Sequence, residues 1–119
     1  MSGAVHWVRE GEIKEGQRDA FEALMAEMAE KARADEPEML SLEWFLSEDG
    51  RHCQVHERYK SSAVAMAQLA TYRRTYAERF LAAVSPTRMV VYGDLDEAVR
   101  GALSDSDPEY FSRIGGFSR

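Results

Sequence analysis

The chain lacks a second cysteine, a long apolar run and an excess of positive charge, and each absence excludes a class of protein. Cys53 is the only cysteine among 119 residues, so no intrachain disulfide and no cysteine-rich metal site can form. No run approaches the roughly 18 consecutive apolar residues of a membrane span, and the N-terminus has no apolar signal-peptide core. A formal net charge of −6 disfavours nucleic acid and anionic membranes as partners. We therefore expect a cytoplasmic protein.

A β-hairpin is the clearest local prediction. Residues 39–59 alternate in polarity on both sides of Asp49-Gly50, a pair favoured in two-residue type I′ turns, in which both residues need positive φ. The register that follows pairs Glu48 with Arg51, and on the same face Leu46 with Cys53, Trp44 with Val55, Leu42 with Glu57 and Leu40 with Tyr59. One carboxylate, that of Glu57, is thereby placed on an apolar and aromatic surface.

The remaining segments predict an alternating order of strands and helices. Periodicity indicates a strand over Val5–Ile13, a helix over Gln17–Arg33, helical runs over Ala63–Ala70 and on toward Val84, a strand over Thr87–Tyr92 and a short helix over Leu95–Leu103. Ser61 or Ser62 is expected to cap the helix after the hairpin. The order β-α-β-β-α-β is typical of an α+β, ferredoxin-like fold with one antiparallel sheet. We expect one domain over residues 1–94 and a C-terminal extension over 95–119, packed on the same domain or on a partner subunit.

The second face of such a sheet needs a cover. The hairpin register places Ser47 with His52, Phe45 with Gln54, Glu43 with His56, and Ser41 with Arg58 on this face. Such a mixed surface can pack against a second copy of itself, so we predict a homodimer with two sheets face to face.

Two stretches resemble the antibiotic biosynthesis monooxygenase-like domains. IKEGQRDAFEALMAEM is similar to the opening strand, Lys-x-Gly and helix of that family. LSLEWFLSEDGRHCQVHERYKSSAVAMAQL is similar to its central hairpin, with Glu57, Arg58 and Tyr59 leading into an alanine-rich helix. The resemblance covers about Val5 to Tyr92.

The resemblance implies a dimeric α+β barrel with a pocket in each subunit between sheet and helices. Enzymes of the family include cofactor-free quinol or anthrone oxygenases and haem-degrading oxygenases, and other members have no assigned reaction. Many members carry a histidine in the helix after the hairpin, where this chain has Gln68. That difference removes the natural haem ligand.

Glu57 is the candidate catalytic residue. Beneath a layer of helices its carboxylate would be partly desolvated, and desolvation raises an acid's pKa toward the range of a general base. Gln68, Tyr72 and Tyr76 lie on the helix stripe expected to face it, and Trp44 could stack on a planar ligand. The alternative is that Glu57 is a structural acid paired with an arginine or with backbone N–H groups, and that the aromatic side chains are only core.

The histidines and the cysteine are weaker candidates for a metal site or a catalytic nucleophile. His52 and His56 would lie about 13 Å apart along a strand, too far to share one ion, so no metal site is expected. His52 and Cys53 point to opposite faces and cannot form a nucleophile–base pair.

Three functions remain open from the sequence. The first is cofactor-independent oxidation of a small aromatic molecule with Glu57 as base; the second is a non-catalytic dimer that binds such a molecule. The third is haem binding, for which His6, His52 and His56 are the candidate ligands.

Overall fold

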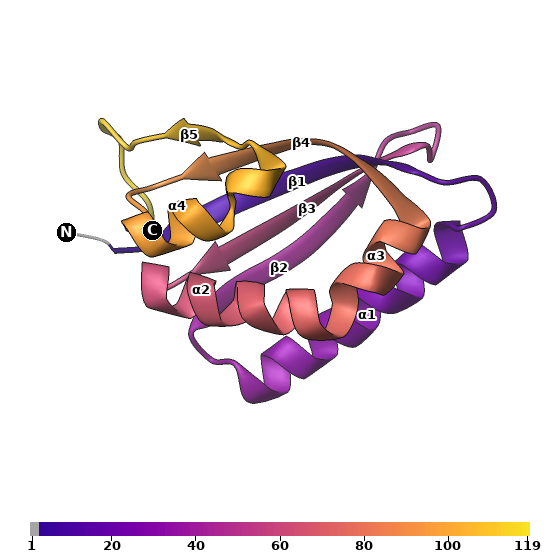
Figure 1. Ribbon diagram of the computed structural model, residues 1–119, viewed down its shortest axis with the longest axis horizontal. Helices are drawn as coiled ribbons and strands as arrows, with labels where there is room; N and C mark the ends of the chain where they lie inside the picture. Colours follow the sequence, from indigo (N-terminus) through magenta and orange to yellow (C-terminus); the bar gives the residue numbers. More distant parts are fainter. Residues whose placement is uncertain (1–2) are drawn as a thin grey trace.

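The computed structural model describes residues 3–119 and shows an open five-stranded sheet with α1, α2 and α3 along one side (Figure 1). The elements are β1 (Val5–Ile13), α1 (Arg18–Asp35), β2 (Met39–Leu46), β3 (His52–Tyr59), α2 (Ser62–Thr71), the π-helix η1 (Tyr72–Tyr76), α3 (Ala77–Ala83), β4 (Val84–Tyr92), α4 (Glu97–Ala102), the 3₁₀ turn η2 (Ser104–Ser106) and β5 (Glu109–Phe111). This confirms the predicted α+β class and the ferredoxin-like order.

The strand order is β2-β3-β1-β4-β5, with the first four strands antiparallel. β5, which the sequence did not predict, runs parallel to β4 along the edge (Figure 1). Leu95, Val99 and Leu103 are buried against this end of the sheet. None of the helices in residues 3–119 is long and apolar enough to cross a membrane.

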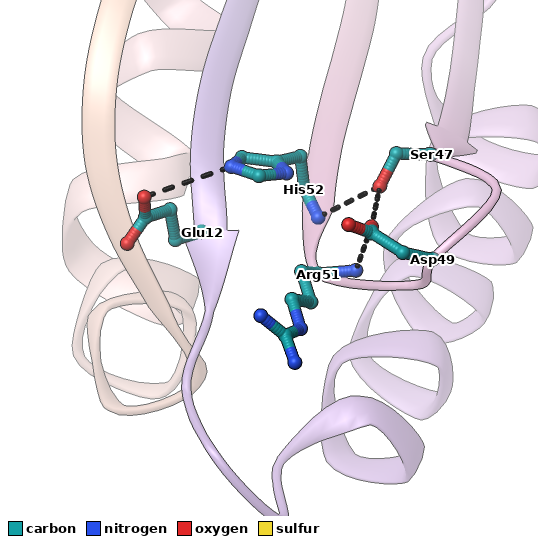
Figure 2. A network of polar contacts seen from close by, with 5 residues as sticks. All are labelled: Glu12, Ser47, Asp49, Arg51 and His52. Carbon is teal, nitrogen blue, oxygen red and sulfur yellow. Dashed lines mark hydrogen bonds and ion pairs between the residues drawn. The ribbon is translucent and has the colours of Figure 1, made fainter.

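The hairpin has the predicted central register but a different turn. Leu46 pairs with Cys53, Trp44 with Val55 and Leu42 with Glu57. In the turn, Gly50 has a φ of 73° while Asp49 is not in the positive-φ region, so the predicted type I′ geometry and the facing of Glu48 with Arg51 are wrong. Instead the loop is closed by the Asp49 carboxylate, which accepts hydrogen bonds from the Ser47 hydroxyl and the Arg51 N–H at 2.6 and 2.9 Å (Figure 2).

The predicted pairing of Leu40 with Tyr59 is also wrong. Met39 lies opposite Tyr59, and the register shifts between Met39 and Ser41. A bulge inserts one extra residue into β2, and Leu40 is half exposed as a result.

The helical layer after the hairpin is one bent helix that begins at Ser62. Ser61 is the N-cap, and its hydroxyl accepts a hydrogen bond from the Val64 N–H. The five-residue π-turn η1 then interrupts the α-helix, a feature frequent at functional sites. β4 begins at Val84, three residues before the predicted start, and Pro86 lies within it. Pro86 is tolerated because it lies opposite Gly11, where a bulge shifts the β1–β4 register.

Two clusters of buried side chains fill the space between sheet and helices. The first lies at the β5 end and contains Trp7, Tyr59 and Leu69, and the second, at the hairpin end, contains Phe21, Val55 and Tyr76. Tyr72 packs against both clusters, so it marks the boundary at which the polar side chains described below are found.

We expect Gly11→Ala to destabilise the fold, because Gly11 lies in close contact with β4. A Cβ at Gly11 would lie 2.4 Å from Val84 Cγ1 and 2.9 Å from the Ser85 carbonyl oxygen. The expected loss is about 1–3 kcal/mol of unfolding free energy, measured by urea denaturation. Gly101→Ala in α4, where nothing lies within 4 Å, is the matched control and should cost nothing. Equal stability of the two variants would contradict this account of the bulge.

Candidate active site

Glu57 is buried at the centre of the sheet, on the face that the helices cover. It lies in β3 between Leu42 of β2 and Trp7 of β1, and its residue is 6% exposed. Among residues 3–119 it is the one polar or charged residue in the fully buried set. A carboxylate in such a place must be paired, because burying an unpaired charge costs several kcal/mol.

Two side chains bind the Glu57 carboxylate, one at each oxygen. The Arg9 Nε donates to Oε1 at 3.1 Å, and the Tyr59 hydroxyl donates to Oε2 in a short hydrogen bond. Arg9 projects from β1 and Tyr59 follows Glu57 by two residues on the same face of β3. The alternative reading of Glu57 as an acid paired with an arginine therefore describes its contacts correctly.

The guanidinium of Arg9 lies among aromatic rings. Its Cζ is 4.6 Å from the centroid of the Tyr72 ring and 5.8 Å from that of Trp7, and its side chain is 14% exposed. Burial is the largest single influence on the pKa of Arg9 and acts to lower it. The charge of Glu57, the nearby Tyr72 and Tyr59 and the hydrogen bond to Glu57 together outweigh burial, so the pKa is raised. Arg9 is thus a permanent cation that makes cation–π contacts with the rings of Tyr72 and Trp7.

The tyrosine hydroxyls at the site are held in the protonated form. Burial raises the pKa of Tyr59 well above its ordinary value, and the charge of Glu57 and the hydrogen bond to it act in the same direction. Burial also raises the pKa of Tyr72. Both hydroxyls can therefore serve as hydrogen-bond donors at any physiological pH.

Two cavities meet at Tyr72. The smaller, of about 20 Å³, is lined by Glu57, Tyr59, Gln68, Tyr72 and Tyr76 together with Met28, Ala32, Met39 and Leu42. The larger, of about 530 Å³, lies between the α2–η1–α3 helix and β4, and Arg9 and Tyr72 line it. The smaller space holds about one water molecule, whereas the larger one is of the size that small-molecule sites have.

The structure brings together most of the predicted site residues. Gln68, Tyr72 and Tyr76 line the small cavity beside Glu57, as the helical stripe suggested. Trp44 lies elsewhere, in a groove between α1 and β2, and its role in substrate binding stays a prediction.

Sequence reasoning missed Arg9 and Tyr59 as partners of Glu57. Arg9 follows Val5 and Trp7 at alternate positions of β1, on the face that the helices cover. An arginine at a core-facing strand position was the available signal that the buried acid had a partner.

The other polar candidates lie apart from this site. Cys53 is buried near the hairpin turn, and burial raises the pKa of its thiol to about 11, which makes it a poor nucleophile. His52 lies 3.6 Å from the Glu12 carboxylate on the other face of the sheet (Figure 2). Among residues 3–119, no three His, Cys, Asp or Glu side chains are placed to share an ion.

Comparison with known proteins gives a family and a fold. The family model described as antibiotic biosynthesis monooxygenase matches residues 4–84. The structure is similar to that of MupZ from Pseudomonas fluorescens, with a TM-score of 0.84 and 24% identity, over 100% of this chain and 91% of that one.

Two further structures are similar over most of the chain. SnoaB, a cofactor-independent oxygenase from Streptomyces nogalater, has a TM-score of 0.66 at 14% identity, over 80% of this chain and 96% of that one. Rv0793 from Mycobacterium tuberculosis has a TM-score of 0.60 at 25% identity, over 80% of this chain and 98% of that one. No curated protein sequence matches the chain significantly.

The raised pKa of Tyr59 gives a pH-dependent prediction. An unfolded chain ionises tyrosine near pH 10, while the folded protein keeps Tyr59 protonated to higher pH. Its contribution to stability is therefore complete below about pH 10 and falls as the pH rises toward the folded pKa. At pH 7, Tyr59→Phe should have a lower unfolding free energy than the wild-type protein, because it lacks the hydrogen bond to Glu57. Above pH 10, the unfolding free energy of the wild-type protein should fall more steeply than that of the variant, by up to about 1.4 kcal/mol per pH unit. Parallel stability curves for the two proteins between pH 7 and 11 would refute this.

Proposed function

Because the chain belongs to the antibiotic biosynthesis monooxygenase family, we propose that it oxidises a small quinol- or anthrone-like aromatic molecule with dioxygen and without a cofactor. One observation carries the proposal. Arg9 pairs with the buried Glu57 carboxylate and also lines the cavity of about 530 Å³. A substrate in that cavity would lie against the same cation that holds the candidate base.

In this reaction the substrate supplies the electrons, and the protein removes a proton from the substrate. Removal of a proton from an acidic OH or CH₂ group gives an electron-rich anion, which reacts with O₂. In an anthrone, one oxygen atom becomes the new carbonyl and the other leaves as water with the two hydrogens of the oxidised CH₂. In a quinol, one oxygen atom enters the ring as a hydroxyl group while the ring is oxidised to a quinone, and the other oxygen atom leaves as water with two hydrogens of the quinol. The protein must therefore provide a base, stabilise an anion and keep bulk water away.

Arg9 can stabilise the anion as it forms. When Glu57 takes the proton its carboxylate becomes neutral, and the positive charge of Arg9 is no longer balanced. The new negative charge is on the substrate in the cavity that Arg9 lines. The negative charge thus moves from one side of the guanidinium to the other, in a site of low dielectric where such interactions are strong.

In the proposed reaction the proton reaches Glu57 through the small cavity beside its carboxylate. The small cavity beside the carboxylate has room for about one water molecule and offers polar partners in Tyr59, Gln68 and Tyr76. Tyr72 lines both spaces. Proton transfer through one water is within the reach of a general base.

We expect Glu57→Gln to lower the rate of oxygen consumption with hydroquinone or anthrone substrates by at least about 100-fold, because a general base contributes that much or more. Glu48→Gln, exposed in the turn between β2 and β3, is the matched control and should keep full activity. An oxygen electrode, with product measured by chromatography, gives the rate and the ratio of one O₂ per product. Equal rates in the two variants would contradict the assignment of Glu57.

A non-catalytic module that binds a small aromatic molecule is the second candidate. It is favoured by the contacts of Glu57, whose two oxygens each accept a hydrogen bond within the protein. In that case a ligand would raise the melting temperature and be recovered unchanged. Recovery of an oxidised product would exclude this candidate.

We also propose that two copies pair through the open faces of their sheets. Phe45 is 49% exposed on this face and contacts the His56 ring edge-on. An exposed aromatic side chain among polar ones is suited to an isologous interface, in which each copy presents the same patch to the other.

Phe45→Asp should convert a dimer into a monomer, because it would bury a carboxylate in the interface. Met66→Asp, at a similarly exposed position on α2, is the control and should leave the mass unchanged. Light scattering coupled to size exclusion measures both. A monomeric wild-type protein, or a dimeric Phe45→Asp variant, would rule out this interface.

A further inference from the structure

The large cavity has a second cation, at its mouth, that the proposed chemistry does not use. Three arginines line the cavity: Arg9, Arg73 and Arg88. Arg9 is paired with Glu57, and Arg88 donates to the Glu109 carboxylate at 2.8 Å. Arg73 donates to the backbone carbonyl of Ala102, and it has no carboxylate within ion-pair distance among the described residues. Arg73 thus brings to the cavity a cation that has no ion-pair partner among the described residues.

The position of Arg73 is set by the π-helix. It is the second residue of η1, directly after Tyr72, whose ring supports Arg9. From there it contacts the carbonyl of Ala102 at the C-terminal end of α4, 29 residues further along the chain. The contact with one carbonyl leaves most of the five N–H donors of the guanidinium available to another acceptor. A π-turn beside a cavity is the kind of local irregularity that functional sites retain.

The rest of the lining is suited to an apolar body. The apolar and aromatic part of the lining includes Leu69, Tyr72, Ala77, Phe80 and Met89. The one cavity-lining acid without a hydrogen bond or ion pair among the described residues is Asp105, an exposed residue of η2 at the mouth. A lining that combines apolar and aromatic side chains with a few charged ones resembles the general pattern of a ligand pocket, in which few charged groups fix the orientation of a mostly apolar molecule.

We propose that this cavity binds an aromatic carboxylic acid, with its ring between Tyr72 and Met89 and its carboxylate on Arg73. The inference rests on the proposed function, since it takes the large cavity as the place where the substrate lies. It adds that the substrate is acidic at the end remote from the reacting oxygen. Arg73 fixes that end, and the reacting oxygen is directed toward Arg9 and Glu57.

The test measures binding alone, with 2-naphthoate as the acidic probe and the uncharged 2-naphthamide as its matched analogue. Isothermal titration calorimetry gives the affinity of each. Arg73→Gln should weaken 2-naphthoate binding about three- to tenfold, as loss of a partly exposed charge-assisted contact does, and should leave 2-naphthamide unaffected. Asp105→Asn should tighten 2-naphthoate binding, because it removes a like charge from the mouth.

Two further variants locate the probe. Arg74→Gln alters the neighbouring residue of the same π-helix, which does not line the cavity, and should change neither affinity. Ala77→Phe narrows the cavity from its wall and should weaken both probes. Equal effects of Arg73→Gln and Arg74→Gln, or unchanged 2-naphthoate binding in Ala77→Phe, would overturn the inference.

The outcome is separable from that of the proposed function. Binding of 2-naphthoate that depends on Arg73, in a protein that consumes no oxygen with any quinol, upholds the site and contradicts the reaction. The opposite result is turnover of an uncharged quinol that depends on Glu57, with 2-naphthoate binding that is unchanged in Arg73→Gln. It would uphold the reaction and overturn the inference that the substrate is acidic.

Discussion

The site depends on the ion pair between Arg9 and Glu57. Both charges lie between the sheet and its helices, and removing each ion from water costs several kcal/mol even after relaxation. Well-packed apolar residues often stabilise a core equally well or better, so the pair is poor evidence of selection for stability. A buried pair of this kind has a clearer physical reason if its charges act on a ligand, and the cavity that Arg9 lines offers the place.

The arrangement of strands makes this pair possible. β1 lies between β3 and β4, so a side chain on its covered face can contact an acid of β3 and still face the space under β4. Trp7 lies directly opposite Glu57, and its ring is next to the Arg9 guanidinium. The ring of Tyr72, from the helical layer, contacts the same guanidinium. Tyr72 is the first residue of the π-turn and packs against both core clusters.

Contacts between residues close together in the sequence could be predicted, whereas contacts between distant segments could not. Alternation of side chains was enough to pair Leu42 with Glu57 and to place the acid on the covered face. The bulge that displaced Leu40 has no comparable sequence signal, because one extra residue leaves the pattern on either side intact. Arg9 is 48 residues from Glu57, and their contact follows only from the strand order. The same holds for Arg73, whose partner belongs to the C-terminal extension.

The two interpretations of Glu57, as base or as structural acid, are not mutually exclusive in this geometry. Each oxygen of a carboxylate can accept more than one hydrogen bond, so Arg9 and Tyr59 leave acceptor capacity on both oxygens. The small cavity lies beside this residue and is lined by polar groups. A fixed carboxylate is also better oriented than a mobile one, and orientation is a large part of what an enzyme contributes. The contacts that hold Glu57 in place are therefore compatible with the proposed role of general base.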